Sequence, residues 1–235
     1  MKLHILGIAG TFMGGVAALA REAGVEVEGS DQAVYPPMST QLERLGIGLH
    51  QGYQPAHIAG DADLVVIGNA LSRGNAAVEA VLDAGRAYSS GAQWLAEHVL
   101  PGRTTLAVAG THGKTTTTSL TASVLAEGGM DPTFVIGGQL LAAGANARLG
   151  GGDWLVAEAD ESDGSFLRLN PLVAVVTNID ADHLENYGGD FARVQAAFSE
   201  FLHRLPFYGL AVLCIDDPEV ARLAEETPRH VTTYG

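Results

Sequence analysis

The residues with the clearest chemical potential form a glycine-rich turn, Gly110-Thr-His-Gly-Lys-Thr115, with Thr116 directly after it. An apolar run over residues 104–109 precedes the turn and predicts a buried strand, and residues 119–126 favour a helix after it. In such an arrangement, backbone amides at the helix start bind phosphate, a lysine reaches the terminal phosphates and a threonine hydroxyl can hold Mg²⁺. The turn therefore predicts an ATP site.

This turn differs from the full phosphate-loop pattern, which has another glycine five residues before the one that precedes the lysine. Val108 occupies that position, so the sequence fits a shortened loop better than the common form. The alternative is an ordinary strand-to-helix turn with a solvated lysine. The phosphate-loop interpretation makes Lys114 a candidate catalytic residue and assigns ATP contacts to Gly110, Thr111, His112, Gly113, Lys114, Thr115 and Thr116.

Acidic and imidazole side chains gather after two apolar segments, residues 153–158 and 172–179. Glu158 ends the first segment and is a candidate catalytic residue and Mg²⁺ ligand, since Mg²⁺ bound to ATP takes one or two protein oxygens. The later acids of this cluster, such as Asp163, orient a substrate or are simply solvated. His183 follows the second segment and is a candidate catalytic residue as a ligand of a second Mg²⁺, with a structural histidine as the alternative. The metal site predicted from these clusters contains Thr115, Glu158 and His183.

A second glycine turn lies near the start of the chain, where an apolar segment over residues 2–9 runs into Gly10-Thr-Phe-Met-Gly-Gly15 and a helical pattern. Asp31 follows about twenty residues later, where an acid meets a ribose hydroxyl in dinucleotide-binding folds. The glycine spacing departs from G-x-G-x-x-G, so a nucleotide sugar, NAD(P) and purely structural glycines all remain open. The candidate substrate contacts here are Gly7, Gly10, Thr11, Met13, Gly14 and Asp31.

Apolar segments of strand length alternate with helical patterns along the chain, which predicts an α/β fold. The first part fits a Rossmann-like, doubly wound parallel sheet whose ligand lies at the carboxyl ends of the strands. The second part fits a phosphate-loop-type α/β ATPase domain that is incomplete. The length of 235 residues favours two domains, and Pro101-Gly102 marks the expected boundary between residues 1–101 and residues 102–235.

The composition is that of a globular protein with an acidic excess. There are 13 basic and 27 acidic residues, giving a net charge of −14, which argues against binding to nucleic acid or to an anionic membrane. The single cysteine, Cys214, allows no internal disulfide and lies in an apolar segment typical of a buried strand. Because no charged-then-apolar leader precedes the first strand and no apolar run is long enough to cross a bilayer, we expect a cytoplasmic protein.

Three motifs, residues 110–116, 158–163 and 178–183, together resemble the Mur ligases, which build the peptide of bacterial peptidoglycan. The resemblance implies ATP-dependent amide bond formation on UDP-N-acetylmuramic acid, whose carboxylate is activated as an acyl phosphate. It implies that Lys114 and the loop amides hold the β- and γ-phosphates, that Thr115 and Glu158 hold one Mg²⁺, and that Glu158 and His183 hold a second. The further contacts expected on this basis are Asn178 for ATP, and Ser72, Arg73 and Asp163 for the sugar nucleotide, with a solvated arginine as the alternative at 73.

The two parts of the chain resemble different members of this family. After about residue 103, segments such as 131–138 and 201–209 resemble ligases that join L-alanine to UDP-N-acetylmuramate. Before residue 100, segments such as 35–42 and 67–75 resemble recycling ligases that attach a whole tripeptide to the same sugar nucleotide. We hypothesise a chimaera with a junction near the expected domain boundary. The hypothesis fails if one natural family covers both halves equally well.

These patterns favour an ATP-dependent ligase that joins L-alanine to UDP-N-acetylmuramate. The alternatives are a tripeptide recycling ligase, a sugar-nucleotide-binding module without catalysis, and an NAD-dependent oxidoreductase. Mur ligases resemble a three-domain design in which the third domain carries the incoming amino acid or peptide, and this sequence stops at Gly235, within the central domain. We therefore expect the chain to bind UDP-N-acetylmuramate, to bind ATP weakly if at all, and not to complete the ligation alone.

Overall fold

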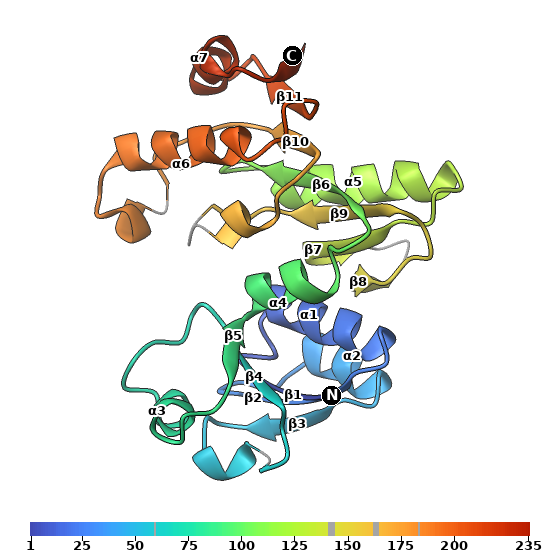
Figure 1. Ribbon diagram of the computed structural model, residues 1–235, viewed down its shortest axis with the longest axis vertical. Helices are drawn as coiled ribbons and strands as arrows, with labels where there is room; N and C mark the ends of the chain where they lie inside the picture. The colour runs from blue at the N-terminus through green and yellow to red at the C-terminus, as the bar shows by residue number, and fades with distance from the viewer. Residues whose placement is uncertain (59, 141–143, 162–164, 183) are drawn as a thin grey trace. The chain divides into compact units, whose positions relative to one another are not determined.

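The computed structural model describes residues 1–235 except 59, 141–143, 162–164 and 183. The chain divides into two compact units (Figure 1). The first contains Met1–Val99 and Val135–Leu149, and the second contains Leu100–Phe134 and Gly150–Gly235. The first unit thus includes a segment from beyond the expected boundary at residues 101 and 102. The assignment of functions to residues 1–101 and 102–235 remains a prediction.

The first unit is built on a five-stranded sheet with the order β3-β2-β1-β4-β5, and all of its neighbouring strands are parallel. Chain order reverses between β1 and β4, which is where doubly wound sheets place their ligand. The strands are β1 Lys2–Leu6, β2 Glu26–Asp31, β3 Gly48–Gln51, β4 Leu64–Ile67 and β5 Tyr88–Ser90. The helices between them are α1 Thr11–Glu22, α2 Met38–Arg44, η1 Pro55–His57, α3 Ala76–Asp83 and α4 Gly91–His98.

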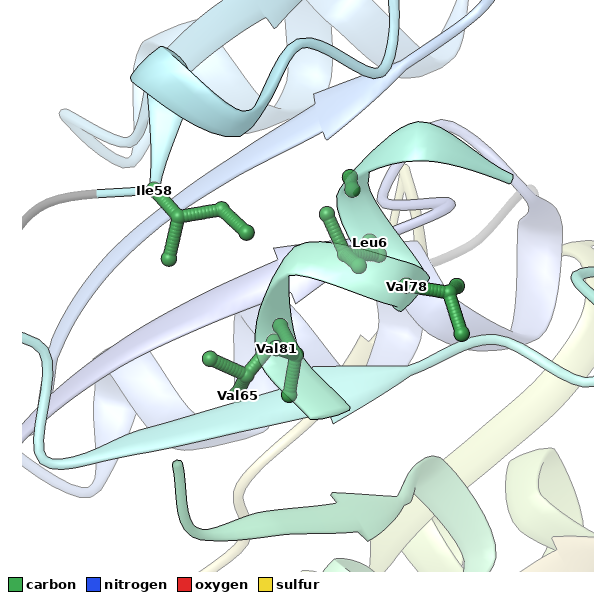
Figure 2. Close-up of a cluster of buried hydrophobic side chains, with 6 residues drawn as sticks. Leu6, Ile58, Val65, Val78 and Val81 are labelled. Atoms are coloured by element: carbon green, nitrogen blue, oxygen red, sulfur yellow. The ribbon is translucent and has the colours of Figure 1, made fainter. Parts of the chain in front are cut away.

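Side chains from the strands and helices of this unit pack into a continuous apolar core. Figure 2 shows one cluster, in which Val78 and Val81 of α3 face Leu6 of β1 and Val65 of β4. Ile58, just after η1, completes this side of the cluster. Strands of a parallel sheet are covered on both faces, and this explains why β4 is an uninterrupted apolar run and why every residue of β1 after Lys2 is buried.

The second unit is built around β6, Thr104–Ala109, with β9 on one side and β10 on the other. The full strand order is β12-β11-β10-β6-β9-β7-β8, and the pairs from β12 to β9 are parallel. The other strands of this seven-stranded sheet are β7 Thr133–Leu140, β8 Ala145–Arg148, β9 Trp154–Glu158, β10 Val173–Val176, β11 Leu210–Cys214 and β12 His230–Tyr234, of which β8 and the part of β7 after Phe134 belong to the first unit. The helices are α5 Lys114–Glu127, η2 Ser165–Arg168, η3 Leu184–Tyr187, α6 Phe191–His203 and α7 Pro218–Glu226.

The observed elements confirm the α/β class and its parallel sheets. The strand expected over residues 104–109 has those bounds, and most other expected strands agree within a few residues. Four strands had no counterpart among the expected apolar segments: β3, β5, β8 and β12. Each of them is an edge strand in the observed order. An edge strand is covered less completely, so it does not need the apolar run that marks a central strand.

The helices differ in whether a side chain accepts hydrogen bonds from the backbone amides of their first turn. Asn75, Ser90, Asp190 and Asp217 accept hydrogen bonds from first-turn amides of α3, α4, α6 and α7. In contrast, α1 begins after Gly10 and α5 begins after Gly113, which have no side chain to accept such bonds. The two glycine turns therefore leave helix amides open toward a ligand. Within the described residues, none of the helices has the length and apolar character needed to cross a membrane.

Candidate functional site

The loop between β6 and α5 is fixed by the segment that follows β10. The Thr111 amide donates to the Asn178 carbonyl (3.0 Å), and the His112 amide donates to Asn178 Oδ1 (2.8 Å). In return, Asn178 Nδ2 donates to the His112 carbonyl (2.9 Å). Asn178 thus closes a reciprocal pair of bonds with His112. This places Asn178 beside the loop as a support of its backbone.

Gly110 occupies a position that only glycine fits. Its φ is +137°, and a Cβ atom there would lie 2.0 Å from Thr177 Oγ1. Gly113 also has a positive φ, +81°, but a Cβ atom there would meet nothing within 4 Å. The sequence spacing identifies both glycines, but only the structure shows why each position requires a glycine. Gly110 allows close approach of two chain segments, and Gly113 turns the chain into α5.

Lys114 lies across this loop as the first residue of α5. Its Nζ donates to the Gly110 carbonyl (2.7 Å), to the Thr111 carbonyl (3.2 Å) and to Glu161 Oε2 (2.8 Å). A lysine ammonium has three N–H donors, so these contacts use all of them. The Lys114 side chain is only 14% exposed.

Glu161 is buried behind the loop, with 3% of its surface exposed. Burial raises the pKa of its carboxyl above the ordinary value, while the hydrogen bond from Lys114 acts in the opposite direction. The Tyr187 hydroxyl donates to the backbone carbonyl of Glu161 and fixes the segment from the other side. As one of the later acids of the 158–163 cluster, Glu161 was expected to orient a substrate or to be solvated, and its burial shows that it is not solvated. Its only sequence signal is its place three residues after Glu158.

Thr115 and Glu158 lie together at the mouth of the loop, with Thr115 Oγ1 donating to Glu158 Oε1 (3.1 Å). A hydroxyl and a carboxylate at this separation are the hard oxygen donors that Mg²⁺ takes beside phosphate oxygens and water, so the pair fits the expected ion. Among the described residues there is no group of three or more His, Cys, Asp or Glu side chains able to hold a metal. The expected ligand His183 and the expected substrate contact Asp163 lie outside the described residues.

An open hollow of about 520 Å³ lies next to the loop. His112 and Asn178 line one side of it, and Phe191 at the start of α6 and Asp217 before α7 line another. Several carboxylates, including Asp180, border the hollow. A neutral aromatic ring suits this lining better than a polyphosphate does. His112 and Asn178 are thus placed to contact a ligand beyond the phosphate loop itself.

The first unit contains a larger cleft, of about 600 Å³, around its glycine turn. A volume of this size is typical of pockets for small ligands. Five of the predicted substrate contacts line it: Gly7, Gly10, Thr11, Met13 and Asp31. They come from the end of β1, the start of α1 and the end of β2. The carboxyl ends of neighbouring parallel strands therefore meet here, as the doubly wound topology predicts.

Asp31 organises the floor of this cleft. Its Oδ2 accepts from the Ala9 amide (2.9 Å) in the glycine turn, and its Oδ1 accepts from the Ala33 amide (3.2 Å). Tyr53 also lines the cleft, and the pKa of its phenol is raised by burial and then by the Asp31 charge. Asp31 is thus at once a support for the turn and an acid exposed to the cleft.

Asn146 of β8 completes the cleft from a distant part of the sequence. It is 2% exposed, its Nδ2 donates to the Thr11 carbonyl (2.5 Å), and its Oδ1 accepts from Gln41 Nε2 (2.6 Å). Gly137 and Gly138 of β7 line the same cleft. Sequence reasoning missed these residues and Tyr53. The glycine pair after an apolar segment was the only local signal.

Three predicted substrate contacts lie elsewhere in the first unit. Ser72 and Arg73 are exposed and are not among the residues that line the cleft. Arg73 instead makes a bidentate pair with Glu79, with Nε–Oε1 and Nη2–Oε2 distances of 2.9 Å. Gly14 is buried in the first turn of α1, where a Cβ atom would lie 2.4 Å from Met38 Sδ. Its role in the structure is close packing between α1 and α2.

The folds and the two sites define a class of α/β proteins in which glycine turns join central parallel strands to uncapped helices. Residues 2–102 match the family description "Mur ligase family, catalytic domain", and residues 108–235 match "Mur ligase middle domain". The chain belongs to the Mur ligase family.

Individual relatives agree with this family. The chain is 61% identical over 234 residues to a UDP-N-acetylmuramate--L-alanine ligase of Stenotrophomonas maltophilia (strain R551-3), a match covering 100% of this chain and 48% of the relative. The same figures hold for the enzyme of that name from Xanthomonas campestris pv. campestris (strain B100). The chain therefore spans about half the length of the curated relatives it matches.

Solved structures show the same fold. A UDP-N-acetylmuramate:L-alanyl-gamma-D-glutamyl-meso-diaminopimelate ligase from Neisseria meningitides has a TM-score of 0.93 and 41% identity, covering 100% of this chain and 78% of that one. The UDP-N-acetylmuramate-alanine ligase from Thermotoga maritima has a TM-score of 0.85 and 30% identity, covering 95% and 51%. Both ligase types therefore match nearly the whole chain. Whole-chain identities average over both halves, so the chimaera hypothesis remains a prediction.

Proposed function

We propose that this chain supplies the sugar-nucleotide-binding and ATP-binding parts of a ligase that joins L-alanine to the carboxylate of UDP-N-acetylmuramate. The 61% identity to ligases of that name supports the reaction. The Lys114 loop with Thr115 and Glu158 beside it supports the use of ATP. The cleft around Gly7 and Asp31 supports a nucleotide-linked substrate in the first unit.

In the second unit, we assign the phosphates of ATP to the start of α5. The open amides that follow Gly113 and the ammonium of Lys114 bind the β- and γ-phosphates. Thr115 and Glu158 would hold Mg²⁺, which would neutralise charge that builds up on the transferred phosphoryl group. Asn178 keeps the loop in shape through its bonds to His112. His183 remains the proposed ligand of a second Mg²⁺.

In the first unit, the diphosphate of the sugar nucleotide is assigned to the start of α1. The amides after Gly10 have no side-chain cap, as at the ATP loop. Asp31 is assigned to a hydroxyl of the ribose, because its carboxylate lies at the carboxyl end of β2 and faces the cleft. Tyr53 and Gln41 supply further polar contacts in the same cleft.

The proposed reaction has two steps. A carboxylate oxygen of the sugar nucleotide attacks the γ-phosphorus of ATP, the bond to the β-phosphate oxygen breaks, and ADP leaves. The amine of L-alanine then attacks the acyl carbon, phosphate leaves with the bonding electrons, and the amine loses a proton. The first step brings two anions together, and Mg²⁺ at Thr115 and Glu158 would supply the compensating charge while Lys114 donates hydrogen bonds to the phosphates.

The single observation that supports this function best is that Lys114 and the hydrogen-bonded pair of Thr115 and Glu158 lie at the same phosphate loop. Titration calorimetry tests the substrate, with UDP-N-acetylmuramate, UDP-N-acetylglucosamine and NAD as the three ligands. We expect the first to bind most tightly. Binding of NAD alone would support the oxidoreductase and contradict the ligase. Binding of the sugar nucleotide without Mg²⁺-ADP would support a module without catalysis.

The second candidate is the recycling ligase, which attaches a tripeptide. The TM-score of 0.93 and 41% identity to the Neisseria meningitides ligase support it. The two candidates differ in the acceptor, so phosphate release is measured with L-alanine and with the tripeptide in separate reactions. Comparing residues 1–100 and 103–235 separately with both ligase types tests the chimaera hypothesis. Equal similarity of both halves to one type would exclude a junction.

The remaining expectations are part of the same proposal. We propose weak ATP binding and no complete ligation by these 235 residues alone. Release of ADP that depends on L-alanine would contradict this. We also propose a cytoplasmic location, consistent with the use of ATP and a sugar nucleotide.

A further inference from the structure

Glu161 and Lys114 form a closed charge pair at the phosphate loop. The Nζ–Oε2 distance is 2.8 Å, and the two side chains are 4% and 14% exposed. The other two ammonium protons are directed to the Gly110 and Thr111 carbonyls. The lysine that should attract phosphate is therefore fully hydrogen-bonded and electrically neutralised within the protein.

A phosphate can engage Lys114 only by replacing one of these acceptors. If it replaces Glu161, a buried carboxylate loses its cation and faces a phosphate a few ångströms away. If it replaces a loop carbonyl, the phosphate is added to a site whose lysine charge is already balanced. Either way, a bare phosphate meets uncompensated negative charge in a poorly solvated place.

We propose that Glu161 makes the phosphate loop selective for metal-bound polyphosphates over metal-free ones. The inference rests on the proposed nucleotide site and concerns a residue that contacts Lys114. The charge of Lys114 is already balanced by Glu161. Mg²⁺ held at Thr115 and Glu158 would supply the positive charge that the phosphates need. A polyphosphate that arrives with its metal is therefore bound, and one that arrives without it is repelled.

Glu161 and Glu158 have different parts in this scheme. Glu158 is partly exposed and its Oε1 lies 3.1 Å from Thr115 Oγ1, so it faces the metal position. Glu161 is buried and bonds to the ammonium. Removing Glu158 should abolish the metal-dependent gain in binding. Removing the charge of Glu161 should instead relieve the penalty on metal-free anions.

The test compares the wild-type chain with Glu161→Gln, which keeps the shape and an acceptor for Lys114 but removes the charge. The probes are tripolyphosphate and ADP, each with excess Mg²⁺ or with EDTA, in titration calorimetry. We expect Glu161→Gln to bind tripolyphosphate and ADP in EDTA at least about tenfold more tightly than wild type. Affinity for the Mg²⁺ complexes should change much less. Unchanged or weaker metal-free binding by Glu161→Gln would overturn the proposal.

Two further variants separate charge from shape. Asp160→Asn removes a neighbouring exposed carboxylate whose charge acts on Glu161, and it should increase metal-free affinity much less than Glu161→Gln does, because Asp160 does not bond to Lys114. Glu161→Asp keeps the negative charge and should keep the selectivity. If Glu161→Gln does not fold, as judged by circular dichroism, Glu161→Ala serves as the second charge-free variant. An equal gain in Asp160→Asn would also overturn the role of Glu161.

The outcomes for the two proposals differ. Failure of wild type to bind Mg²⁺-ADP would count against the nucleotide site, while tripolyphosphate would still compare Glu161→Gln with wild type. Normal binding of Mg²⁺-ADP with no gain in Glu161→Gln would count against the selectivity alone.

Discussion

Single residues at the two glycine turns hold backbone in conformations that ordinary side chains avoid. At the loop after β6, Gly110 lets the chain pass against Thr177, and Asn178 then ties down His112. At the turn after β1, the Asp31 carboxylate performs the equivalent task by accepting from the Ala9 amide. In both turns, a polar side chain from a neighbouring strand end fixes the loop that faces the ligand. Preorganised amides of this kind do not have to be ordered when an anion binds.

Gly110→Ala should be far more damaging than Gly113→Ala. The first adds a Cβ atom 2.0 Å from Thr177 Oγ1 at a φ of +137°, so strain and overlap together should cost about 3 kcal/mol. The second carries only the backbone strain of a φ of +81°, about 1–2 kcal/mol. Urea denaturation of both variants measures the difference. Equal losses would mean that the loop moves away from Thr177 without cost.

Asp31→Ala and Arg73→Ala should show whether affinity for the sugar nucleotide depends on the cleft or on the exposed surface at residue 73. Asp31→Ala removes the acceptor for the Ala9 amide and the acid in the cleft, so affinity for UDP-N-acetylmuramate should fall about tenfold or more. Arg73 is paired with Glu79 away from the cleft lining, so Arg73→Ala should change affinity less than about twofold. Calorimetry with both variants decides. A large loss in Arg73→Ala would show that the arginine leaves Glu79 to reach the ligand.

At the scale of elements, two helices without a side-chain cap, α1 and α5, begin at the two candidate sites, and α2, which follows Pro37, also has no such cap. α3, α4, α6 and α7 each have an Asn, Ser or Asp that accepts first-turn amides. α1 and α5 follow glycines instead. The open amides leave about half a unit of positive charge at each helix start. The chain as a whole has a net charge of −14, so such local positive ends are needed to hold anionic ligands.

Strands β1 and β2 also carry a buried histidine, which makes stability depend on pH. His4 is fully buried, with Nδ1 3.1 Å from Glu28 Oε1 and Nε2 2.9 Å from Ser30 Oγ. His50 and His57 stack in series beside it, and Lys2 lies 3.6 Å from Glu28. Burial is the main cause that lowers the pKa of His4 below its ordinary value, although Glu28 acts in the opposite direction. The neighbouring imidazoles add to the lowering.

The unfolded chain therefore takes up a proton at His4 at a higher pH than the folded chain does. The free energy of unfolding should fall as the pH drops from about 6.5 toward the lower pKa of the folded state. His4→Gln should flatten this part of the pH profile, whatever its own cost to stability. His203→Gln, at an exposed position in α6, is the control and should keep the wild-type slope. Urea denaturation between pH 5 and pH 8 measures the slopes, and equal slopes for His4→Gln and wild type would contradict the assignment.

At the scale of the whole molecule, sequence order and spatial units differ. Residues 135–149 follow the phosphate loop in sequence but belong to the first unit. There, Val135 and Ala147 approach Gly15 of α1, and the Leu149 amide donates to Glu22 (2.5 Å). Asn146 bridges Thr11 and Gln41 in the same region. The cleft around the first glycine turn is therefore not made by the first hundred residues alone.

Asn146→Ala should weaken sugar-nucleotide binding even though residue 146 lies in the sequence range of the middle domain. The substitution leaves the Gln41 amide without its acceptor and frees the start of α1, and a loss of about tenfold is expected. Binding of Mg²⁺-ADP to the second unit should stay within about twofold of wild type, which serves as the internal control. Calorimetry with each ligand measures both effects. Equal loss of both affinities would indicate a general loss of folding instead.

The sequence allowed most of the central structure to be predicted. Thr104–Ala109 was recognisable because a strand covered on both faces must be apolar throughout. The start of α5 was less clear, since the expected helix began at residue 119 and the observed one begins at Lys114. Threonines have low helix propensity, so the sequence pattern did not indicate a helix before residue 119. In the structure Thr118 Oγ1 donates back to the Lys114 carbonyl (2.8 Å).

The sequence by itself determined the fold class, the two glycine turns and the family, because glycine spacing, buried-strand runs and acids at strand ends are local patterns. Only the tertiary structure decided which polar groups meet. It joined Glu161 to Lys114, Asn178 to His112 and Asn146 to Thr11 by hydrogen bonds, across sequence separations of 47, 66 and 135 residues. Such contacts depend on strand order and on which segments approach in space. A local pattern of residues does not show the order of strands in a sheet.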